Sequence, residues 1–347
     1  MTESQLSVIV CTYNGAAEIG SCLDALLSQD TSDPFEILVV DDGSTDGTAE
    51  LVERYPVRLV RHGDNRGLGA ARNTGIAAAT GSVLAFTDDD CVPQAGWVRS
   101  LLAPYSDRAV IGVGGPVVAL ETDNWLRRYL SLNNPLAPLE IDLADSSGFG
   151  HRLALYLRRA WHPRPDPGPV RQVYSFVGAN MSFRREALEA IGCFDDTIHF
   201  GGEDEDVCVR VRERFSDRSL WFQPSAVICH NFDADMYDTL RRSYAYGRGS
   251  ARAFVEARAE LPTVYPVPIF VALLLTVGLV RRRFLGAAML APLIAFPRWV
   301  RHLRSSRAEA LLHPYIECAQ EAAHDVGFLS IWRARHALTN AREAAQA

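Results

Sequence analysis

The stretch Phe86-Thr87-Asp88-Asp89-Asp90 places three consecutive carboxylates directly after the apolar run 83–86. The run predicts a buried β-strand, and a strand that ends in aspartates carries acidic side chains to the carboxyl edge of a sheet, where open α/β proteins bind ligands. Because three adjacent negative charges repel one another, we expect a cation beside them. Oxygen ligands favour Mg²⁺ or Mn²⁺, which in proteins often serve substrate phosphates. The alternative for an isolated Asp-Asp-Asp is a solvated turn that caps the next helix.

Three more apolar runs lie upstream, and a helical pattern follows each of them. They span residues 6–11, 36–40 and 57–60. Short runs of this kind are typical of parallel strands that are buried on both faces. Four successive strand-helix units therefore predict an α/β domain with a mostly parallel central sheet flanked by helices. Three of the strands end in polar turns that contain glycine, so we expect one ligand cleft at their common edge.

The charge of the 347-residue chain is unevenly distributed. Residues 1–235 carry 20 Arg against 34 Asp and Glu, whereas residues 236–347 carry 15 Arg against 8, so the two parts have net charges of −14 and +7. We therefore expect a catalytic domain in 1–235 and a basic, apolar helical region in 236–347, in different surroundings. Seven Cys without a CxxC pair favour a reducing, cytoplasmic compartment. We expect no signal peptide and no nucleic-acid partner.

Each strand-end turn contains side chains with a chemical use. Asp42 can accept a hydrogen bond from a nucleobase or a ribose hydroxyl, whereas Ser44 and Asp46 fit a turn and a helix cap. The stretch 67–72 has two glycines in the manner of a dinucleotide fingerprint, but it follows the third strand and lacks a third glycine, which argues against a dehydrogenase. Arg72 lies either near a phosphate or base, or in an ion pair on a helix surface.

A second acidic centre, Glu203-Asp204, begins a predicted helix. The helix macrodipole favours carboxylates in the first turn, and we expect it to lower their pKa. Simple helix capping is one interpretation of these acids; the other is that one carboxylate faces the cleft as a general base. His230 follows the apolar run 226–229, a position that is usually structural.

These motifs together resemble the family 2 glycosyltransferases of GT-A fold, over about residues 5–232. The motifs follow one another in the family's order: Thr12-Tyr13-Asn14, 41–46, Asn65-Arg66-Gly67, Ala71-Arg72-Asn73, Asp88-Asp89-Asp90, Gly178-Ala179-Asn180 and Glu203-Asp204. The resemblance implies a nucleotide-sugar pocket. The residues that would bind the nucleotide or donor are Thr12, Tyr13, Asn14, Asp41, Asp42, Asn65, Gly67, Arg72, Asp88, Asp89, Gly178, Ala179 and Asn180.

The resemblance also implies the metal ligands and the base. Asp88 and Asp90 would form the D-x-D motif that contacts the ribose and the metal, and His230 would complete the metal shell. An imidazole beside carboxylates suits Mn²⁺ somewhat better than Mg²⁺. By the same match Asp204 is the general base, and Glu203 is the alternative base or a group that orients the acceptor.

The segment 134–172 is rich in Pro, Gly and aromatic residues. A long irregular insert in a compact domain is often a lid or a binding loop, so we expect an acceptor or lid loop here. Trp161 is either a platform for a sugar ring or, as is more usual, a packing residue.

The C-terminal region contains a predicted basic amphipathic helix at 237–259, apolar runs at 264–280 and 284–296, and predicted Ala-rich helices in 308–347. A membrane span needs about 20 apolar residues, so the first run is marginal and the second is too short. If both runs crossed from the cytoplasm, Arg281-Arg282-Arg283 would lie outside, against the positive-inside tendency. We therefore expect a re-entrant or interfacial hairpin on anionic lipid at the cytoplasmic face of the membrane, with association through 236–300. The alternative is a pair of buried core helices.

The sequence thus predicts a metal-dependent inverting transfer of a sugar from a nucleoside-diphosphate sugar, expected to be a UDP-sugar, to an acceptor hydroxyl. The acceptor would be a lipid-linked or cell-envelope glycan or a small molecule. A sugar-nucleotide nucleotidyltransferase is an alternative, although residues 12–20 lack the basic residues of a phosphate loop. A non-catalytic nucleotide-sugar-binding membrane adaptor is another, although the full set of acids argues against it.

Overall fold

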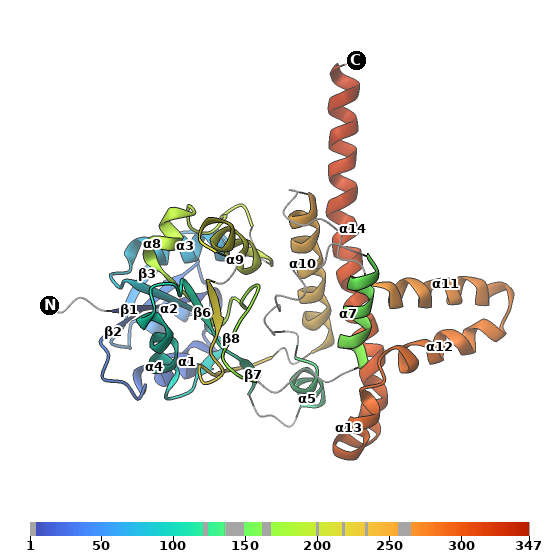
Figure 1. Ribbon diagram of the computed structural model, residues 1–347, viewed down its shortest axis with the longest axis horizontal. Helices are drawn as coiled ribbons and strands as arrows, with labels where there is room; N and C mark the ends of the chain where they lie inside the picture. The colour runs from blue at the N-terminus through green and yellow to red at the C-terminus, as the bar shows by residue number, and fades with distance from the viewer. Residues whose placement is uncertain are drawn as a thin grey trace. The chain divides into compact units, whose positions relative to one another are not determined.

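The computed structural model describes residues 5–120, 124–134, 136, 149–161, 168–198, 201–216, 219–232, 235–255 and 265–346. The chain divides into two compact units, the first within 1–145 and 167–232 and the second within 146–166 and 233–347 (Figure 1). Much of the predicted irregular segment 134–172 lies outside the described residues. The longest described stretch of this segment, α7 (Phe149–Trp161), is a helix of the second unit and differs from the predicted loop. The reason is composition, because Leu, Arg and Ala dominate this stretch and are strong helix formers.

An eight-stranded sheet forms the centre of the first unit, in the order β3-β2-β1-β4-β9-β6-β10-β8. Its strands are β1 (Leu6–Thr12), β2 (Phe35–Asp41), β3 (Arg58–Arg61), β4 (Val83–Asp88), β6 (Gly112–Gly114), β8 (Arg171–Gln172), β9 (Met181–Arg184) and β10 (Leu220–Phe222). The first four pair in parallel with one another, whereas β9 pairs antiparallel with β4 and β6; Cys11 of β1 lies between Val40 and Asp88. The four predicted strands and the mostly parallel α/β fold are confirmed. Polar residues at the ends of β1, β2 and β4 therefore share one edge.

A smaller sheet of three strands lies beside this edge, in the order β5-β11-β7. Its strands are β5 (Cys91–Pro93), β7 (Val117–Ala119) and β11 (Ile228–His230). The chain passes from β4 into β5 through Asp89 and Asp90, so these aspartates occupy the junction of the two sheets. Strands β6 and β7 follow each other closely in the chain but belong to different sheets, and Gly115 lies between them. A Cβ on Gly115 would lie 1.9 Å from the Ala226 carbonyl oxygen, which only glycine permits.

Short helices complete the first unit. They are α1 (Ile19–Leu27), α2 (Thr48–Val52), α3 (Leu68–Ala78), α4 (Trp97–Leu102), the 3₁₀ turn η1 (Ala103–Ser106), α5 (Trp125–Leu132), α8 (Arg185–Ala190) and α9 (Glu203–Arg214). Helix α3 packs against β1 and β2, and Gly75 permits the close approach because a Cβ there would lie 2.4 Å from the Ile9 side chain. The core contains Phe86, Phe183 and Val207 among other fully buried apolar residues. This packing fixes the start of α3, with Arg72, under the sheet edge.

The described part of the second unit is helical. With α7 it contains α10 (Met236–Val255), α11 (Pro266–Val280), α12 (Arg283–Ala295), α13 (Trp299–Ser306), η2 (Arg307–Leu312) and α14 (His313–Gln346). Helices α10 and α14 cross closely, since a Cβ on Gly247 would lie 1.9 Å from the His324 carbonyl oxygen. Helices α11 and α12 form a hairpin that projects laterally from α14 (Figure 1). Among the described helices, none has both the length and the apolarity that crossing a bilayer requires.

Candidate functional site

The loops after β1 and β2 are hydrogen-bonded to each other at the sheet edge. The Asn14 side-chain oxygen accepts a hydrogen bond from the Thr45 amide at 2.9 Å, and the Asn14 amide donates to Ser44 Oγ at 2.8 Å. The Thr12 hydroxyl donates to the Asp89 carboxylate, which links β1 to the turn after β4. Tyr13 beside them is 51% exposed and free to meet a ligand. The structure therefore brings the first predicted motif against the three aspartates.

Asp42 is buried, and its carboxylate organises the turn before α3. It accepts hydrogen bonds from the amides of Arg66 at 2.9 Å and Gly67 at 2.8 Å, and its Oδ1 lies 2.6 Å from His62 Nδ1. These contacts place Gly67 at the edge, next to the exposed Asn65. His62 was not singled out from the sequence, although its position directly after β3 at the same edge was a usable signal.

Asp41 at the end of β2 is fully buried. Its Oδ1 accepts a hydrogen bond from the Ser44 amide at 2.9 Å, and its Oδ2 lies 3.2 Å from Arg61 Nε. These contacts hold the turn after β2, so the structure gives Asp41 a supporting place behind the predicted donor residues.

Arg72 connects the two acidic centres. Its guanidinium lies 2.9 Å from Glu203 Oε1 and 3.7 Å from Asp88 Oδ1, and it stands over the Phe194 ring at 5.3 Å. The residue is 1% exposed, so an ion pair on a helix surface is excluded. A Cβ on Gly178 would come within 2.6 Å of the guanidinium, so the glycine makes room for it. The end of β4 and the start of α9 are thus held together through one buried cation.

Asp204 lies in the first turn of α9, half-buried next to the glycine-rich segment. Its Oδ2 accepts a hydrogen bond from the Gly178 amide at 2.9 Å. Burial, together with the negative charge of Glu203, raises the pKa of Asp204 to about 7. The prediction that the macrodipole lowers the pKa of these acids is therefore wrong for Asp204, because desolvation and like-charge repulsion outweigh the helix terminus. A carboxylate of this pKa is well suited to accept a proton near neutral pH.

The other two residues of the glycine segment lie in the core. Ala179 and Asn180 are buried, and the side-chain oxygen of Asn180 accepts a hydrogen bond from the Trp97 indole at 2.9 Å. The side-chain nitrogen of Asn180 donates to the carbonyl oxygens of Pro116 at 3.1 Å and Ala226 at 2.8 Å. Asn180 therefore joins both sheets beneath the site, and Gly178 is the member of the segment that contacts another predicted site residue.

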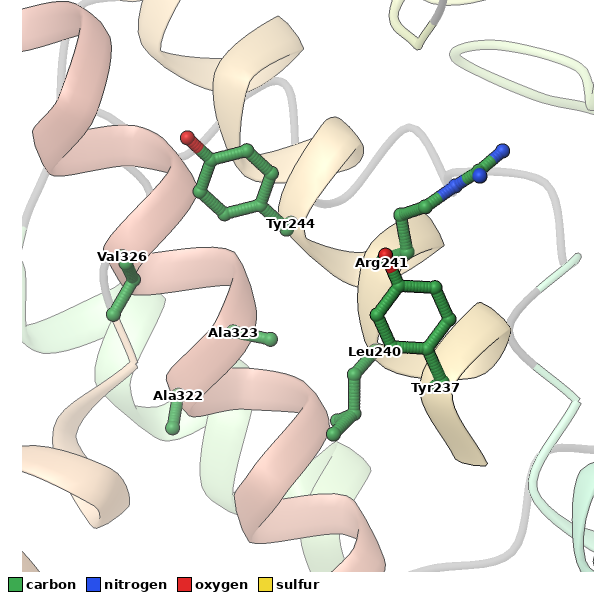
Figure 2. A pocket seen from close by; sticks show the side chains of 7 residues that line it. All are labelled: Tyr237, Leu240, Arg241, Tyr244, Ala322, Ala323 and Val326. Atoms are coloured by element: carbon green, nitrogen blue, oxygen red, sulfur yellow. The ribbon is translucent and has the colours of Figure 1, made fainter. Parts of the chain in front are cut away.

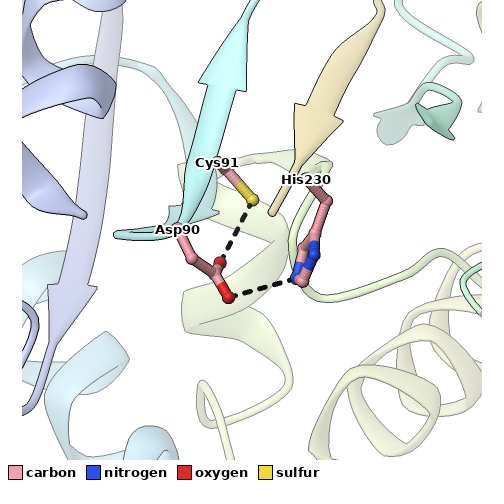
Figure 3. A group of neighbouring side chains, drawn as sticks. All are labelled: Asp90, Cys91 and His230. Carbon is pink, nitrogen blue, oxygen red and sulfur yellow. Dashed lines mark hydrogen bonds and ion pairs between the residues drawn. The ribbon is translucent and has the colours of Figure 1, made fainter. Parts of the chain in front are cut away.

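A candidate metal centre lies where β5 and β11 pair (Figure 3). Because the strands are antiparallel with His230 opposite Cys91, the imidazole reaches Asp90, and His230 Nε2 lies 3.3 Å from Asp90 Oδ2. The ligand atoms of Asp90, Cys91 and His230 lie within 4.8 Å of one another. Of the predicted ligands, Asp90 and His230 belong to this group, and Asp88 Oδ1 lies 3.7 Å from the Arg72 guanidinium.

The donor atoms of this centre fit a divalent cation. Burial raises the pKa of the Cys91 thiol well above its usual value, and the thiol lies 3.6 Å from Asp90 Oδ1 as a donor. The imidazole nitrogen of His230 and the carboxylate oxygen of Asp90 form a pair of ligands that suits Mn²⁺. Burial and the charges of its neighbours also raise the pKa of Asp89, to about 7, and a bound cation would relieve this repulsion.

A separate hollow of about 390 Å³ lies in the second unit, between α10 and α14 (Figure 2). Tyr237 and Tyr244 line it from α10 and Val326 from α14. Its lining contains Arg241 as a charged group but no carboxylate, and none of the predicted site residues lies there. The predicted site residues described above lie in the first unit.

The fold is GT-A-like. One similar solved structure is the mannosyltransferase PcManGT from Pyrobaculum calidifontis in complex with GDP-Man and Mn²⁺. The matched region covers 94% of this chain and 87% of the mannosyltransferase chain, with a TM-score of 0.55 and 20% sequence identity. A likeness at this identity concerns the fold. The sequence profile of glycosyl transferase family 2 matches residues 7–192, more than half of the chain. The chain therefore belongs to glycosyl transferase family 2.

Two curated relatives extend the similarity beyond that profile. The pre-mycofactocin glycosyltransferase of Mycobacterium tuberculosis is 32% identical over 250 residues, which are 71% of this chain and 47% of the relative. This chain thus spans about half the length of that protein. The glycosyltransferase AglE of Haloferax volcanii is 27% identical over 274 residues, which are 77% of this chain and 79% of the relative.

Proposed function

We propose that the chain is a metal-dependent inverting glycosyltransferase that moves a sugar from a nucleoside-diphosphate sugar to an acceptor hydroxyl. The observation that carries the proposal is the buried bridge from Asp88 through Arg72 to Glu203, which brings the carboxylates after β4 and the acids of α9 to one place. Family membership and the relatives named as glycosyltransferases support this activity.

The donor would lie over the loops after β1, β2 and β3. Thr12, Asp42 and Gly67 shape this surface through their hydrogen bonds, and exposed Tyr13 and Asn65 are placed to meet a nucleotide. We infer a UDP-sugar as the donor. Asp90 and His230 would hold Mn²⁺ or Mg²⁺, which when bound neutralises charge on the departing nucleoside diphosphate. The similar mannosyltransferase structure contains GDP-Man and Mn²⁺, which supports this kind of site.

Asp204 is the proposed general base. The acceptor oxygen attacks the anomeric carbon from the face opposite the leaving group, and a new carbon–oxygen bond forms. The bond from that carbon to the diphosphate oxygen breaks, the nucleoside diphosphate leaves with the electron pair, and Asp204 takes the proton of the hydroxyl. Glu203 is less suited to this step because its carboxylate is already paired with Arg72 at 2.9 Å. It is better placed to hold Arg72 and the acceptor side of the site.

The test compares Asp204→Asn with Glu203→Gln. We expect Asp204→Asn to lower sugar transfer by about 10²–10⁴-fold, the usual contribution of a general base, while donor binding stays within a few-fold of wild type. Thermal-shift titration with UDP-, GDP- and dTDP-sugars in Mn²⁺ identifies the donor and checks its binding, and product formation measures transfer. Full activity in Asp204→Asn together with a loss in Glu203→Gln would assign the base to Glu203 instead.

The metal centre is tested separately with Asp90→Ala. This variant should weaken Mn²⁺-dependent binding of UDP and leave the metal-free binding unchanged, because it removes one of two protein ligands. Asp196→Ala is a matched control, since Asp196 is an exposed aspartate of the same unit. Equal Mn²⁺ dependence in the wild type and in Asp90→Ala would remove Asp90 from the metal site.

The acceptor is proposed to be a lipid-linked or cell-envelope glycan that is presented at the cytoplasmic face of a membrane, with a small-molecule acceptor as the alternative. The support for this is the basic and apolar character of 236–300, which differs from that of the catalytic part. Transfer to lipid-linked sugars presented in vesicles, compared with transfer to free sugars of the same structure, measures this preference.

A further inference from the structure

The α11–α12 hairpin exposes large apolar side chains along its whole length. Leu279 and Val280 are 84% and 85% exposed, and Met289 and Ile294 of α12 are 66% and 69% exposed. Helix α11 contains no charged residue, and α12 contains Arg283 alone. A helix that is apolar on all sides is normally covered, yet these side chains have no cover from the described residues of their own unit.

Small residues lie at the contact between the two helices, and many of the large apolar residues face outward. Gly278 and Ala288 are buried there, and a Cβ on Gly278 would lie 2.6 Å from the Leu285 side chain. The Thr276 hydroxyl donates to the Ala272 carbonyl oxygen at 2.8 Å, so this polar group is satisfied within its helix. Helix pairs in water bury their large apolar residues, whereas pairs in lipid pack through small residues and turn the large ones outward.

The turn of the hairpin carries three consecutive exposed arginines, Arg281, Arg282 and Arg283. Exposed arginines beside a fully apolar surface match the border between lipid tails and lipid phosphates. Helix α11 has 15 residues and is therefore roughly 22 Å long, which is shorter than the hydrocarbon core of about 30 Å. Insertion with the turn first would leave the arginines inside the hydrocarbon, which is costly. An orientation along the membrane surface lets them reach the phosphates.

We propose that the α11–α12 hairpin embeds in one leaflet of an anionic bilayer, parallel to the membrane surface, with the arginines of its turn on lipid phosphates. The base of the hairpin is tied to the rest of the unit, because the Tyr265 amide donates to Asp325 at 2.9 Å and the Tyr315 hydroxyl donates to the Met289 carbonyl oxygen at 2.8 Å. Large exposed apolar side chains lie on both helices, and lipid tails can cover them together, whereas a second protein copy would cover one face. The inference goes beyond sugar transfer and does not depend on it, because lipid binding requires neither donor nor acceptor.

The test is flotation of the full chain with phosphatidylcholine vesicles that contain or lack phosphatidylglycerol. We expect binding to the mixed vesicles that weakens in high salt. Arg281→Ser/Arg282→Ser should lower the partition coefficient by roughly 25-fold, from about fivefold for each arginine. Arg54→Ser/Arg108→Ser is the control with the same change of charge, since both arginines are exposed in the first unit, and it should stay within about twofold of wild type.

A second pair of variants tests the apolar contact. Leu279→Ser/Val280→Ser should lower binding by roughly a hundredfold, because both side chains leave water on insertion. Leu27→Ser/Leu132→Ser changes two exposed leucines of the first unit, and we expect binding within about twofold of wild type. Equal loss in the hairpin and control variants would overturn the proposal. A second combination of results would also overturn it. In that case the wild type does not float with the vesicles, sedimentation shows a dimer, and Leu279→Ser/Val280→Ser dissociates the dimer, because the hairpin would then bind a second copy.

Discussion

The sheet edge of the first unit and the α11–α12 hairpin of the second break the usual distribution of residues in opposite directions. At the sheet edge Arg72 and Glu203 are charged and buried, whereas in the hairpin Leu279 and Val280 are apolar and exposed. The buried charges have partners within the protein, at 2.9 Å in the case of Arg72 and Glu203. In the part of the second unit that the structure describes, no residues cover the apolar side chains in this way.

The difference shows what compensates for the unfavourable placement of the side chains in each region. A buried charge is tolerated when an opposite charge compensates for its desolvation, so the first unit stabilises its site internally. An exposed apolar surface is compensated only by something outside the chain. The first region is therefore expected to respond to changes in its own ion pairs, and the second to respond little to changes on its outer surface.

The largest expected effect on stability comes from breaking the buried ion pair. Arg72→Met leaves the Glu203 carboxylate buried without its cation, which should cost about 3–5 kcal/mol and lower the Tm of the first unit by roughly 6–20 °C. Differential scanning calorimetry measures it. The double variant Arg72→Met/Glu203→Leu removes both charges and should recover most of the loss. If the double variant is as unstable as the single one, Arg72 acts through packing and not through the pair.

The strands and turns of the first unit could be predicted because their signals are local. The apolar run at 83–86 and the aspartates after it indicate a strand and its end without knowledge of the strand's neighbours. Strand β4 has these bounds in the structure, since it ends at Asp88. The burial of Arg72 could not be predicted, since its partner Glu203 is 131 residues away and only the tertiary fold brings the two side chains together. The order of charged residues along the chain does not show which of them pair in the folded protein.

The candidate site shows the same limit. The macrodipole at the start of α9 is visible in the sequence, but the desolvation that raises the pKa of Asp204 is a property of the folded environment. The register that sets His230 opposite Cys91 likewise depends on the pairing of β11 with β5. For the hairpin, the helices and the arginine turn were predicted, whereas the outward direction of the large side chains required the structure. The predicted alternative, a pair of buried core helices, is wrong because these side chains are exposed.

The next effect concerns the pH dependence of transfer. Only the ionised form of Asp204 can accept a proton, and with a pKa of about 7 that fraction falls from about one half at pH 7 to about one hundredth at pH 5. We therefore expect kcat to fall about 50-fold from pH 7 to pH 5 and to level off above pH 8. Initial rates at saturating donor and Mn²⁺ measure it, with donor binding followed over the same range. The residual rate of Asp204→Asn should be flat across this range, and a matching slope in that variant would assign the titration to another group.

A smaller effect is expected at the crossing of α10 and α14. Gly247→Ala places a Cβ 1.9 Å from the His324 carbonyl oxygen, so the helices must separate, at a cost of about 1–3 kcal/mol to the second unit. Thermal unfolding followed by circular dichroism measures it. A Tm equal to that of the wild type would mean that α10 and α14 can separate at this point without loss of stability. The second unit is therefore expected to be sensitive where its helices meet, in contrast to its outer surface.

The smallest effect is expected at Gly286, which lies within α12 and whose added Cβ would meet open space. Gly286→Ala removes backbone freedom from the unfolded chain and adds no contact, so it should stabilise the second unit by at most about 1 kcal/mol. The measurement is the same thermal unfolding, in the absence of lipid. Because alanine fits a surface facing lipid as well as one facing water, vesicle binding should be unchanged. A clear loss of stability in lipid-free buffer would instead mean that another part of the protein covers the hairpin, and the contrast between the two regions would then disappear.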